Sequence, residues 1–202
     1  MQKNLAFDIG CNVGKYTLAL LNEGYSKVIS VDPNPHLLNI QDERVVRVFG
    51  ACSDKNTIIP FYFSNADTIS TASIDWVKNS RFANQYKWEK YGVESTTIDN
   101  LVSQFGIPDH IKIDVEGYEE TVLKGMSKKY ADEICFEWAE EEGDSTVRCV
   151  EYLKNLGYEK FGFIFTDTYL KKPENYYDID DFKKIFVYDK NRKTEWGMIW
   201  AK

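Results

Sequence analysis

The sequence predicts an α/β fold in which helices cover both faces of a mostly parallel sheet. Apolar runs of strand length alternate with amphipathic segments of helix length along the 202 residues, as parallel strands joined by helical crossovers require. A glycine-containing turn follows the first apolar run, as in folds that bind a ligand at the carboxyl ends of their strands. The length and the 43% hydrophobic content suit one large domain, residues 1–202.

Seven apolar runs are expected to form the sheet. They are residues 5–9, 28–31, 45–50, 110–115, 133–138, 161–165 and 197–201. An eighth run, residues 58–63, contains Pro60 and is therefore expected at a sheet edge or as one arm of a hairpin. Residues 64–91 are polar with scattered aromatic side chains, and we interpret them as an insertion or lid.

Amphipathic segments between these runs are expected to form the covering helices. The expected helices begin near Val13, Pro35, Thr97, Val122 and Asp144. Thr97 is a good N-cap, and glycines at positions 24, 106 and 157 can end three of the helices.

The charge balance argues against several classes of partner. Twenty-five basic and 32 acidic residues give a net charge of −7. The sequence also has no basic stripe that could bind a phosphate backbone. No apolar run approaches the ~20 residues needed to span a bilayer. The cysteines at positions 11, 52, 135 and 149 lie far apart and form no C-x-x-C pair, so we expect reduced thiols and a cytoplasmic setting. Cys135 and Cys149 are expected to be small buried hydrophobic residues.

The strongest local signal is the glycine loop, residues 8–14 (DIGCNVG), between the first strand and the first helix. Its G-x-x-x-G spacing differs from the G-x-G-x-x-G loop that admits a pyrophosphate. It suits a cofactor without phosphate, such as S-adenosylmethionine, whose ammonium group Asp8 could neutralise. An ordinary tight turn is the alternative.

Acidic residues after the next two strands extend this interpretation. Asp32, eighteen residues after Gly14, could accept hydrogen bonds from two ribose hydroxyls; with the prolines beside it, it could instead form a turn or cap a helix. Ser53 and Asp54, just past the third strand, are expected near an adenine ring, with a plain turn as the alternative for Asp54.

A second acidic group is expected where the strand of residues 110–115 ends. Asp114 and Glu116 are two residues apart, so on a strand they would project from the same face. A buried acid must be paired, bound to metal, or kept neutral by a raised pKa. The alternative is that Asp114 caps the following helix and Glu116 is solvated.

Glu137, at the end of the neighbouring strand, is expected beside Asp114. Removal of a proton from a hydroxyl could then use a carboxylate whose pKa desolvation has raised, or a magnesium or manganese ion held by Asp114 and Glu137. His110, at the opposite end of its strand, is expected to have a surface or packing role.

Four segments resemble the FkbM-type methyltransferases, which use S-adenosylmethionine. They are residues 8–17 (DIGCNVGKYT), 31–35 (VDPNP), 97–101 (TIDNL) and 111–117 (IKIDVEG) with 122–125 (VLKG). The resemblance covers about residues 4–140. It implies a Rossmann-like class I methyltransferase fold and O-methylation of a hydroxyl on a sugar, a glycan or a similar small metabolite.

By this resemblance Asp8, Gly10, Asn12, Gly14 and Asp32 are expected to contact the cofactor, and Asp114 with Glu116 to form the reaction-side pair. Together with the residues placed by the strand order, the cofactor-side candidates are Asp8, Gly10, Asn12, Gly14, Tyr16, Thr17, Asp32, Ser53, Asp54 and Asp114, and the catalytic candidates are Asp114, Glu116 and Glu137. Residues 64–91 and 144–202 are expected to shape the acceptor site. Family members usually carry sequence ahead of the glycine loop, so either a cap is missing here or the chain is one domain of a longer protein.

Several other functions require sequence features that this chain lacks. Methylation of bases uses an Asn/Asp-Pro-Pro-aromatic loop or a nucleophilic cysteine after the fourth strand, where this chain has DVEG. A nicotinamide-dependent oxidoreductase would need the tighter glycine motif. A non-catalytic binding module and a protein substrate remain alternatives. The expected partner is a small-molecule or glycan acceptor, with no nucleic acid and no membrane.

Overall fold

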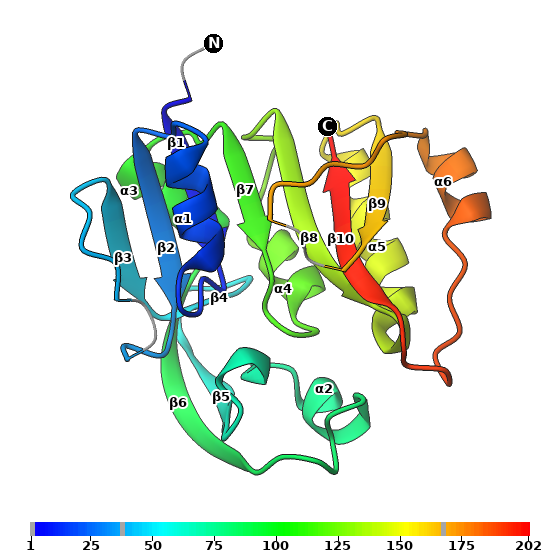
Figure 1. The fold of residues 1–202 in the computed structure, drawn as a ribbon, viewed down its shortest axis with the longest axis horizontal. Helices are drawn as coiled ribbons and strands as arrows, with labels where there is room; N and C mark the ends of the chain where they lie inside the picture. Colours follow the sequence, from blue (N-terminus) through cyan, green and yellow to red (C-terminus); the bar gives the residue numbers. More distant parts are fainter. Residues whose placement is uncertain (1–2, 37–38, 167–168) are drawn as a thin grey trace.

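A seven-stranded sheet forms the centre of the protein in the computed structural model, which describes residues 3–36, 39–166 and 169–202 (Figure 1). The strand order is β3-β2-β1-β7-β8-β10-β9. These strands are β1 (Leu5–Ile9), β2 (Lys27–Asp32), β3 (Val45–Phe49), β7 (His110–Ile113), β8 (Glu133–Ala139), β9 (Phe161–Phe165) and β10 (Trp196–Ala201). Only β10 runs against its neighbours. The predicted α/β fold with a mostly parallel seven-stranded sheet is confirmed.

The central strands are buried on both sides, which explains their continuous apolar sequences. In β1, Leu5, Phe7 and Ile9 point into the larger core, and Ala6 points into a smaller core on the other face. This two-residue alternation follows from strand geometry. It leaves Asp8 as a polar side chain on the face of the smaller core, and it is fully buried.

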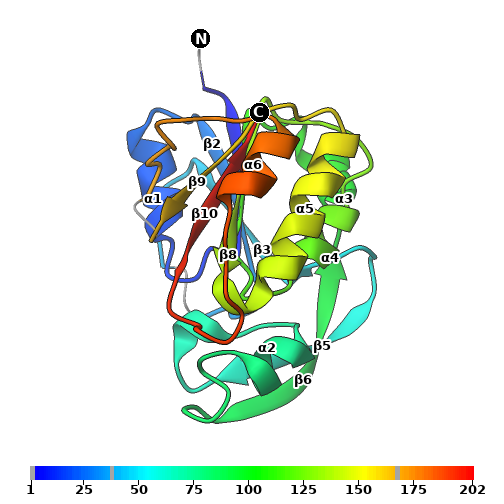
Figure 2. The ribbon, with the colours of Figure 1, turned by 90° about the vertical axis from the view of Figure 1, so that its right-hand side faces the viewer.

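Helices cover both faces of the sheet, as predicted. Helix α1 (Lys15–Asn22) covers one face, whereas α3 (Ile98–Phe105), α4 (Glu119–Lys124) and α5 (Gly143–Asn155) cover the other (Figures 1 and 2). Helix α6 (Ile179–Ile185) packs beside α5 and β9. The sequence pattern did not predict α6, because the tyrosine-rich tail has no clear helical periodicity.

The helix ends show which local signals were sufficient. Thr97 caps α3 by accepting a hydrogen bond from the Asn100 backbone N–H, as expected. Helix α1 starts later than Val13 because Gly14 precedes it in a left-handed conformation. Asp144 does not cap α5, because it lies in the first turn and binds Tyr188 and Lys190. Of the helix expected from Pro35, residues 35–36 form a turn and residues 37–38 lie outside the described residues.

A small second sheet projects from the carboxyl ends of the parallel strands (Figure 1). It contains β4 (Ala51–Cys52), β5 (Ile58–Ser64) and β6 (Trp88–Thr96) in the order β4-β6-β5. The predicted hairpin arm is therefore confirmed, since β5 pairs antiparallel with β6. The connection between them carries η1 (Asp67–Ile69) and α2 (Ile74–Asn79). Residues 88–91 belong to β6, so the expected insertion is shorter than 64–91.

The described residues contain no helix that is both long and apolar enough to cross a membrane. The four cysteines are buried and form no disulfide with one another. His110 is buried as well, which agrees with the packing role expected for it and not with a surface position.

Candidate active site

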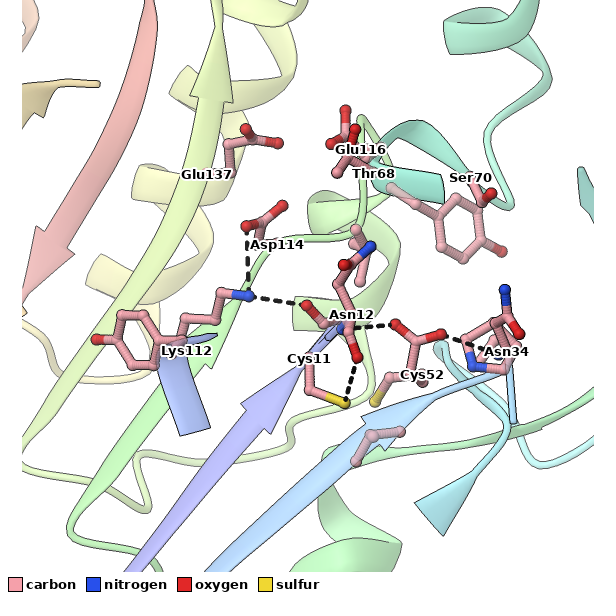
Figure 3. Close-up of a pocket in the computed structure, with 18 of the residues that line it drawn as sticks. Cys11, Asn12, Asn34, Cys52, Thr68, Ser70, Lys112, Asp114, Glu116 and Glu137 are labelled. Carbon is pink, nitrogen blue, oxygen red and sulfur yellow. Dashed lines mark hydrogen bonds and ion pairs between the residues drawn. The ribbon is translucent and has the colours of Figure 1, made fainter. Parts of the chain in front are cut away.

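A cavity of about 470 Å³ lies at the carboxyl ends of β1, β2, β7 and β8 (Figure 3). The glycine loop and the end of β2 form one part of its wall, and the segment after β7 forms another. From β1 the chain adds strands first on one side of the sheet (β2, β3) and then on the other (β7, β8). Open α/β sheets bind ligands at such a switch point, between β1 and β7 in this protein.

The glycine loop follows a path that depends on the absence of a side chain at Gly10. Its φ is +74°, and a Cβ atom at this position would lie 1.7 Å from the carbonyl oxygen of Asp114. The N–H groups of Gly10 and Cys11 both donate to the carbonyl of Val31, at 2.9 and 3.1 Å. The loop is therefore fixed against β2 on one side and against the segment after β7 on the other.

Asp32 ends β2 at the cavity wall, where sequence analysis expected a ribose-binding carboxylate. Its two oxygens accept hydrogen bonds from the backbone N–H groups of Asn12 and Asn34, both at 2.9 Å. These donors fix the carboxylate but leave each oxygen another lone pair for a ligand hydroxyl. Burial raises the pKa of Asp32, against the opposing effect of these hydrogen bonds.

Asp8 lies beneath the cavity and is not part of its wall, contrary to our expectation. Its side chain is 0% exposed, and one oxygen accepts a hydrogen bond from the Thr17 hydroxyl at 2.6 Å. The other oxygen lies 3.3 Å from the Lys112 ammonium. Asp8 and Thr17 therefore support the glycine loop from below, and direct contact with a ligand in the cavity would require a rearrangement.

The remaining cofactor-side candidates divide into two groups. Asn12 and Tyr16 line the cavity, and the Tyr16 hydroxyl lies 2.9 Å from Nε2 of His110. Gly14, Ser53 and Asp54 are not among the lining residues. In the segment after β3, the cavity is lined by residues 50–52, which directly precede Ser53 and Asp54.

Lys112 connects the glycine loop to the acidic residues, and sequence analysis assigned it no role. Its ammonium donates to the Gly10 carbonyl at 2.9 Å and lies 3.3 Å from both Asp8 and Asp114. Only 4% of its side chain is exposed. The sequence did contain a signal for this role, namely a lysine within the apolar run of β7. A buried charge requires partners, so such a lysine indicates nearby acidic groups.

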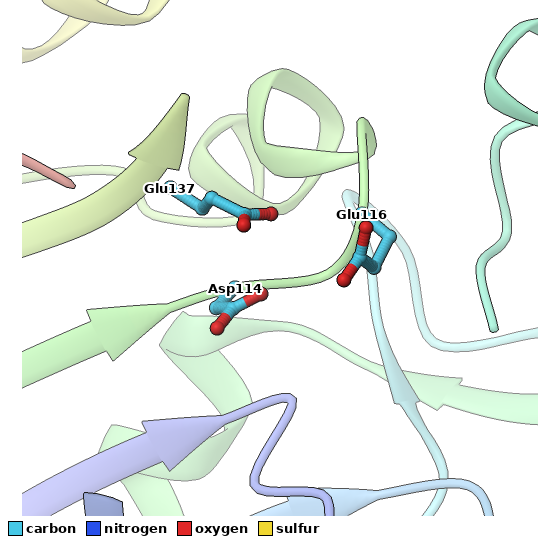
Figure 4. A group of neighbouring side chains, drawn as sticks. All are labelled: Asp114, Glu116 and Glu137. Carbon is cyan, nitrogen blue, oxygen red and sulfur yellow. The ribbon is translucent and has the colours of Figure 1, made fainter. Parts of the chain in front are cut away.

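Asp114, Glu116 and Glu137 form an acidic cluster on the cavity wall (Figure 4). One carboxylate oxygen from each residue lies within 4.8 Å of the other two. The expected grouping is therefore present, but the expected strand geometry is not. Strand β7 ends at Ile113, and Glu116 reaches the cluster from a turn in which its own φ is +58°.

This turn also answers the alternative that Asp114 caps the next helix. The residue that precedes α4 as its N-cap is Tyr118. The N–H of Val115 is bound by the Glu119 side chain, at 2.8 Å. A left-handed conformation at a residue other than glycine is unfavourable, and such positions concentrate at functional sites.

Burial and mutual repulsion control the protonation of the cluster. The pKa values of Glu116 and Glu137 are raised well above the usual range, first by burial and then by the negative charge of Asp114. Lys112 acts in the opposite direction but does not offset these effects. Carboxyl groups with raised pKa values are typical of general bases and of cation sites.

Comparison with known proteins identifies the family. The model of the methyltransferase FkbM domain matches residues 8–160. The chain belongs to the FkbM methyltransferase family. The resemblance found in the four sequence segments is thereby confirmed, and S-adenosylmethionine is the methyl donor that membership implies. No protein with a curated description matches the chain significantly.

Several solved structures are similar in fold to this methyltransferase. Precorrin-6y C5,15-methyltransferase from Geobacter metallireducens has 12% identity and a TM-score of 0.48, with 99% of this chain and 80% of that chain covered. A provisionally assigned S-adenosylmethionine-dependent methyltransferase from Listeria monocytogenes has 10% identity, a TM-score of 0.43, and coverages of 99% and 90%.

A third similar structure is a provisionally assigned hemolysin from Streptococcus thermophilus. Its identity to this methyltransferase is 13% and its TM-score is 0.44. It covers 98% of this chain, which in turn spans 58% of that protein's length.

The rest of the cavity wall comes from two segments that the sequence analysis expected to shape the acceptor site. The connection between β5 and β6 contributes Thr68, Ser70 and Ala72, and the C-terminal part contributes Tyr169 and Trp196. Hydroxyl groups and aromatic rings therefore line the same cavity as the acidic cluster.

The residues present fit S-adenosylmethionine. Asp32 offers a fixed carboxylate for two ribose hydroxyls, and the left-handed Gly10 lets a ligand approach the loop backbone. Cys52 also lines the cavity, and burial raises the pKa of its thiol to about 12. No group with phosphate-binding geometry is needed for this donor.

Proposed function

We propose that this methyltransferase transfers a methyl group to a hydroxyl of a sugar, a glycan or a similar small polyhydroxy metabolite. One observation supports this proposal above all. The acidic cluster lines the same cavity as the glycine loop and Asp32, so a hydroxyl beside the carboxylates would also lie beside the donor.

The part of the cavity formed by the glycine loop and the end of β2 would hold the donor. Asp32 would bind the ribose, the backbone of residues 10–12 would face the amino-acid end, and residues 50–52 would flank the adenine. S-adenosylmethionine supplies an activated methyl group on a positively charged sulfur. The protein's own contribution is to align the acceptor with that group and to remove the hydroxyl proton.

Removal of the proton is assigned to the acidic cluster. An ordinary carboxylate is a weak base for an alcohol, but burial raises the pKa of Glu116 and Glu137 and so strengthens them as proton acceptors. Asp114 lies between these two residues and the Lys112 ammonium. The negative charge of Asp114 would keep the pKa values of the two glutamates raised. Asp114 would also orient the acceptor.

A divalent cation offers a second chemistry for the same cluster. Three carboxylate oxygens within 4.8 Å of one another form a set of hard ligands, which suits magnesium or manganese better than zinc. Such an ion would acidify a bound hydroxyl directly. In this version Glu116 joins Asp114 and Glu137 as a ligand.

Two aromatic rings of the cavity wall support a sugar acceptor. Tyr169 and Trp196 line the cavity, and aromatic faces pack well against the apolar faces of sugar rings. The net charge of −7 and the acidic wall oppose a nucleic-acid acceptor. The proposed partner is therefore a small molecule or a single glycan residue.

The test is a transfer assay with labelled S-adenosylmethionine and a panel of sugars, with and without EDTA. Asp114→Ala should leave donor affinity, measured by calorimetry, within about threefold and reduce turnover at least a hundredfold. Asp132→Ala changes an exposed acid in a turn and serves as the control. Near-normal turnover of Asp114→Ala would refute the assignment.

EDTA separates the two chemistries. Loss of activity in EDTA, restored by magnesium or manganese, would establish the cation version, whereas unchanged activity would establish the cluster as the base. Donor binding without methylation of any tested hydroxyl compound would favour a non-catalytic module or a protein acceptor.

A further inference from the structure

Two segments that are far apart in the sequence meet above the acidic cluster. The first is the roof segment, residues 65–87, between β5 and β6. The second is the pre-β10 loop, residues 187–195. Figure 2 shows the pre-β10 loop descending from the end of α6 to the roof segment. Both segments bind the dipeptide Glu140–Glu141, which follows β8 directly.

Arg81 attaches the roof segment to Glu141 through a two-pronged ion pair. Its Nε and Nη2 donate to the two carboxylate oxygens at 2.9 and 2.6 Å, and its backbone N–H donates to one of them at 3.0 Å. The side chains are 18% and 5% exposed, respectively. Charge-assisted, bidentate pairs of this kind are the strongest class of side-chain hydrogen bond.

The same guanidinium also binds the pre-β10 loop. It donates to the carbonyl oxygens of Thr194 at 3.1 Å and Glu195 at 2.9 Å. From the other direction, the Lys193 ammonium donates to the carbonyl of Asn79, at the end of α2. Arg81 is thus the point at which β8, the roof segment and the pre-β10 loop are joined.

Glu140 fixes the conformation of the pre-β10 loop at the two residues whose carbonyl oxygens Arg81 binds. Its fully buried carboxylate accepts hydrogen bonds from the backbone N–H groups of Thr194 and Glu195, at 3.0 and 3.1 Å, and from the guanidinium of Arg192. The residue after this loop is Trp196, which lines the cavity. The position of Trp196 therefore depends on the same cluster of interactions.

The other attachments of the roof segment, apart from the Lys193 contact, are the buried Trp76 side chain and hydrogen bonds from neutral groups. Asn12 donates to the Asp67 carbonyl at 2.9 Å. The Thr71 hydroxyl lies 2.7 and 3.2 Å from the carbonyl oxygens of Glu116 and Val115, and Thr71 also pairs with Tyr62 of β5. Loss of a neutral hydrogen bond costs less than removal of one partner of a buried ion pair. Loss of Arg81 would consequently release the roof at the side that carries the acidic cluster and Trp196.

We propose that Arg81 is a positioning residue for the methyl acceptor: it holds the roof segment and Trp196 over the acidic cluster, so that the acceptor binds a preformed site. This inference rests on the proposed function in one respect, the location of the acceptor. Arg81 does not line the cavity, so it acts on the acceptor through residues that do, including Glu116, whose carboxyl group its positive charge also influences.

The test compares Arg81→Met, Arg81→Lys and Glu141→Gln with Arg148→Met. Arg148 also pairs with a glutamate, Glu120, but on the exposed side of α5, so it controls for loss of an arginine ion pair. Hydrogen–deuterium exchange of peptides within residues 65–87 is measured in the full chain without ligand, and donor affinity is measured by calorimetry. The KM and kcat are measured with the best acceptor from the sugar panel.

Exchange in the roof segment should accelerate at least about tenfold in Arg81→Met and Glu141→Gln and remain at the wild-type rate in Arg148→Met. The acceptor KM should rise at least about tenfold, donor Kd should stay within about threefold, and Arg81→Lys should recover part of the loss. If Arg81→Met does not fold, Arg81→Lys and Glu141→Gln carry the test.

Unchanged exchange in folded Arg81 and Glu141 variants would overturn the proposal, as would faster exchange with an unchanged acceptor KM. If no sugar is methylated by the wild-type protein, the proposed function fails. The exchange result still decides whether Arg81 holds the roof.

Discussion

The ammonium of Lys112 and the carboxylate of Asp114 lie 3.3 Å apart, at the boundary between the glycine loop and the acidic cluster. The same ammonium lies 3.3 Å from the fully buried Asp8 and donates to the Gly10 carbonyl. One cation therefore balances charge beneath the proposed donor site and beside the proposed reaction site. The two halves of the cavity are physically coupled through this side chain.

Replacement of Lys112 should destabilise the fold. Lys112→Met removes the cation between two carboxylates and should lower the free energy of unfolding by about 3–5 kcal/mol, measured by urea denaturation. The double variant Lys112→Met with Asp8→Asn removes one of the orphaned charges and should recover part of that loss. If the double variant is the less stable of the two, charge balance is not the reason for the lysine.

Replacement of Asp32 should act on donor binding. Asp32→Ala removes the proposed ribose acceptor and also the partner of two backbone N–H groups, so S-adenosylmethionine affinity should fall about 10- to 100-fold by calorimetry. Asp32→Asn keeps an acceptor oxygen and should fall less. Equal affinity of Asp32→Ala and the wild type would exclude the residue from the donor site.

Gly10→Ala should be much more damaging than Gly24→Ala, although both glycines have positive φ values. Alanine at either position incurs backbone strain of about 1–2 kcal/mol. At Gly24 a Cβ would meet no atom within 4 Å, whereas at Gly10 it would lie 1.7 Å from the Asp114 carbonyl oxygen. Thermal unfolding and donor calorimetry should show a small loss of stability for Gly24→Ala and loss of binding for Gly10→Ala. Similar behaviour of the two variants would contradict the close approach.

His110 should make stability depend on pH. Burial lowers its pKa to about 3 from the usual 6.5, with smaller effects from Lys172 and Lys3. Between these values the unfolded chain binds a proton that the folded protein excludes, so stability should fall as the pH drops from 6.5 towards 3, by at most about 1.4 kcal/mol per unit.

The measurement for His110 is urea denaturation across this pH range. Carboxylates also titrate there, so the informative quantity is the difference between the wild type and His110→Gln. The variant should show a weaker dependence because glutamine does not titrate. Parallel curves for the two proteins would mean that the histidine takes up its proton in the folded state.

The fold could be predicted largely from local patterns. The first strand was predicted with its observed bounds, Leu5–Ile9, because a fully buried parallel strand has a continuous apolar sequence. Helix α6 was not predicted, since its burial depends mainly on Phe182, which packs against α5 and β9. Strand β6 was partly assigned to the insertion because its residues are mostly exposed and show no regular alternation.

The site could be predicted in its composition but not in all of its geometry. Asp32 and the acidic cluster lie at the cavity, because the ends of parallel strands meet at one edge of the sheet. Asp8 faces Thr17 and Lys112 instead, and no sequence spacing could reveal the partner of a buried carboxylate. Arg81 and Glu141 are 60 residues apart, and only the tertiary fold brings them together.

The reversed direction of β10 has a practical consequence for experiments on this enzyme. Because β10 opposes β8, Trp196 pairs with Ala139 at the cavity end of the sheet, and Ala201 pairs with Ile134 at the other end. Lys202 therefore emerges on the side of the molecule remote from the cavity mouth. A tether or fluorescent label attached at Lys202 would leave substrates free to diffuse in, so immobilised enzyme can be assayed directly.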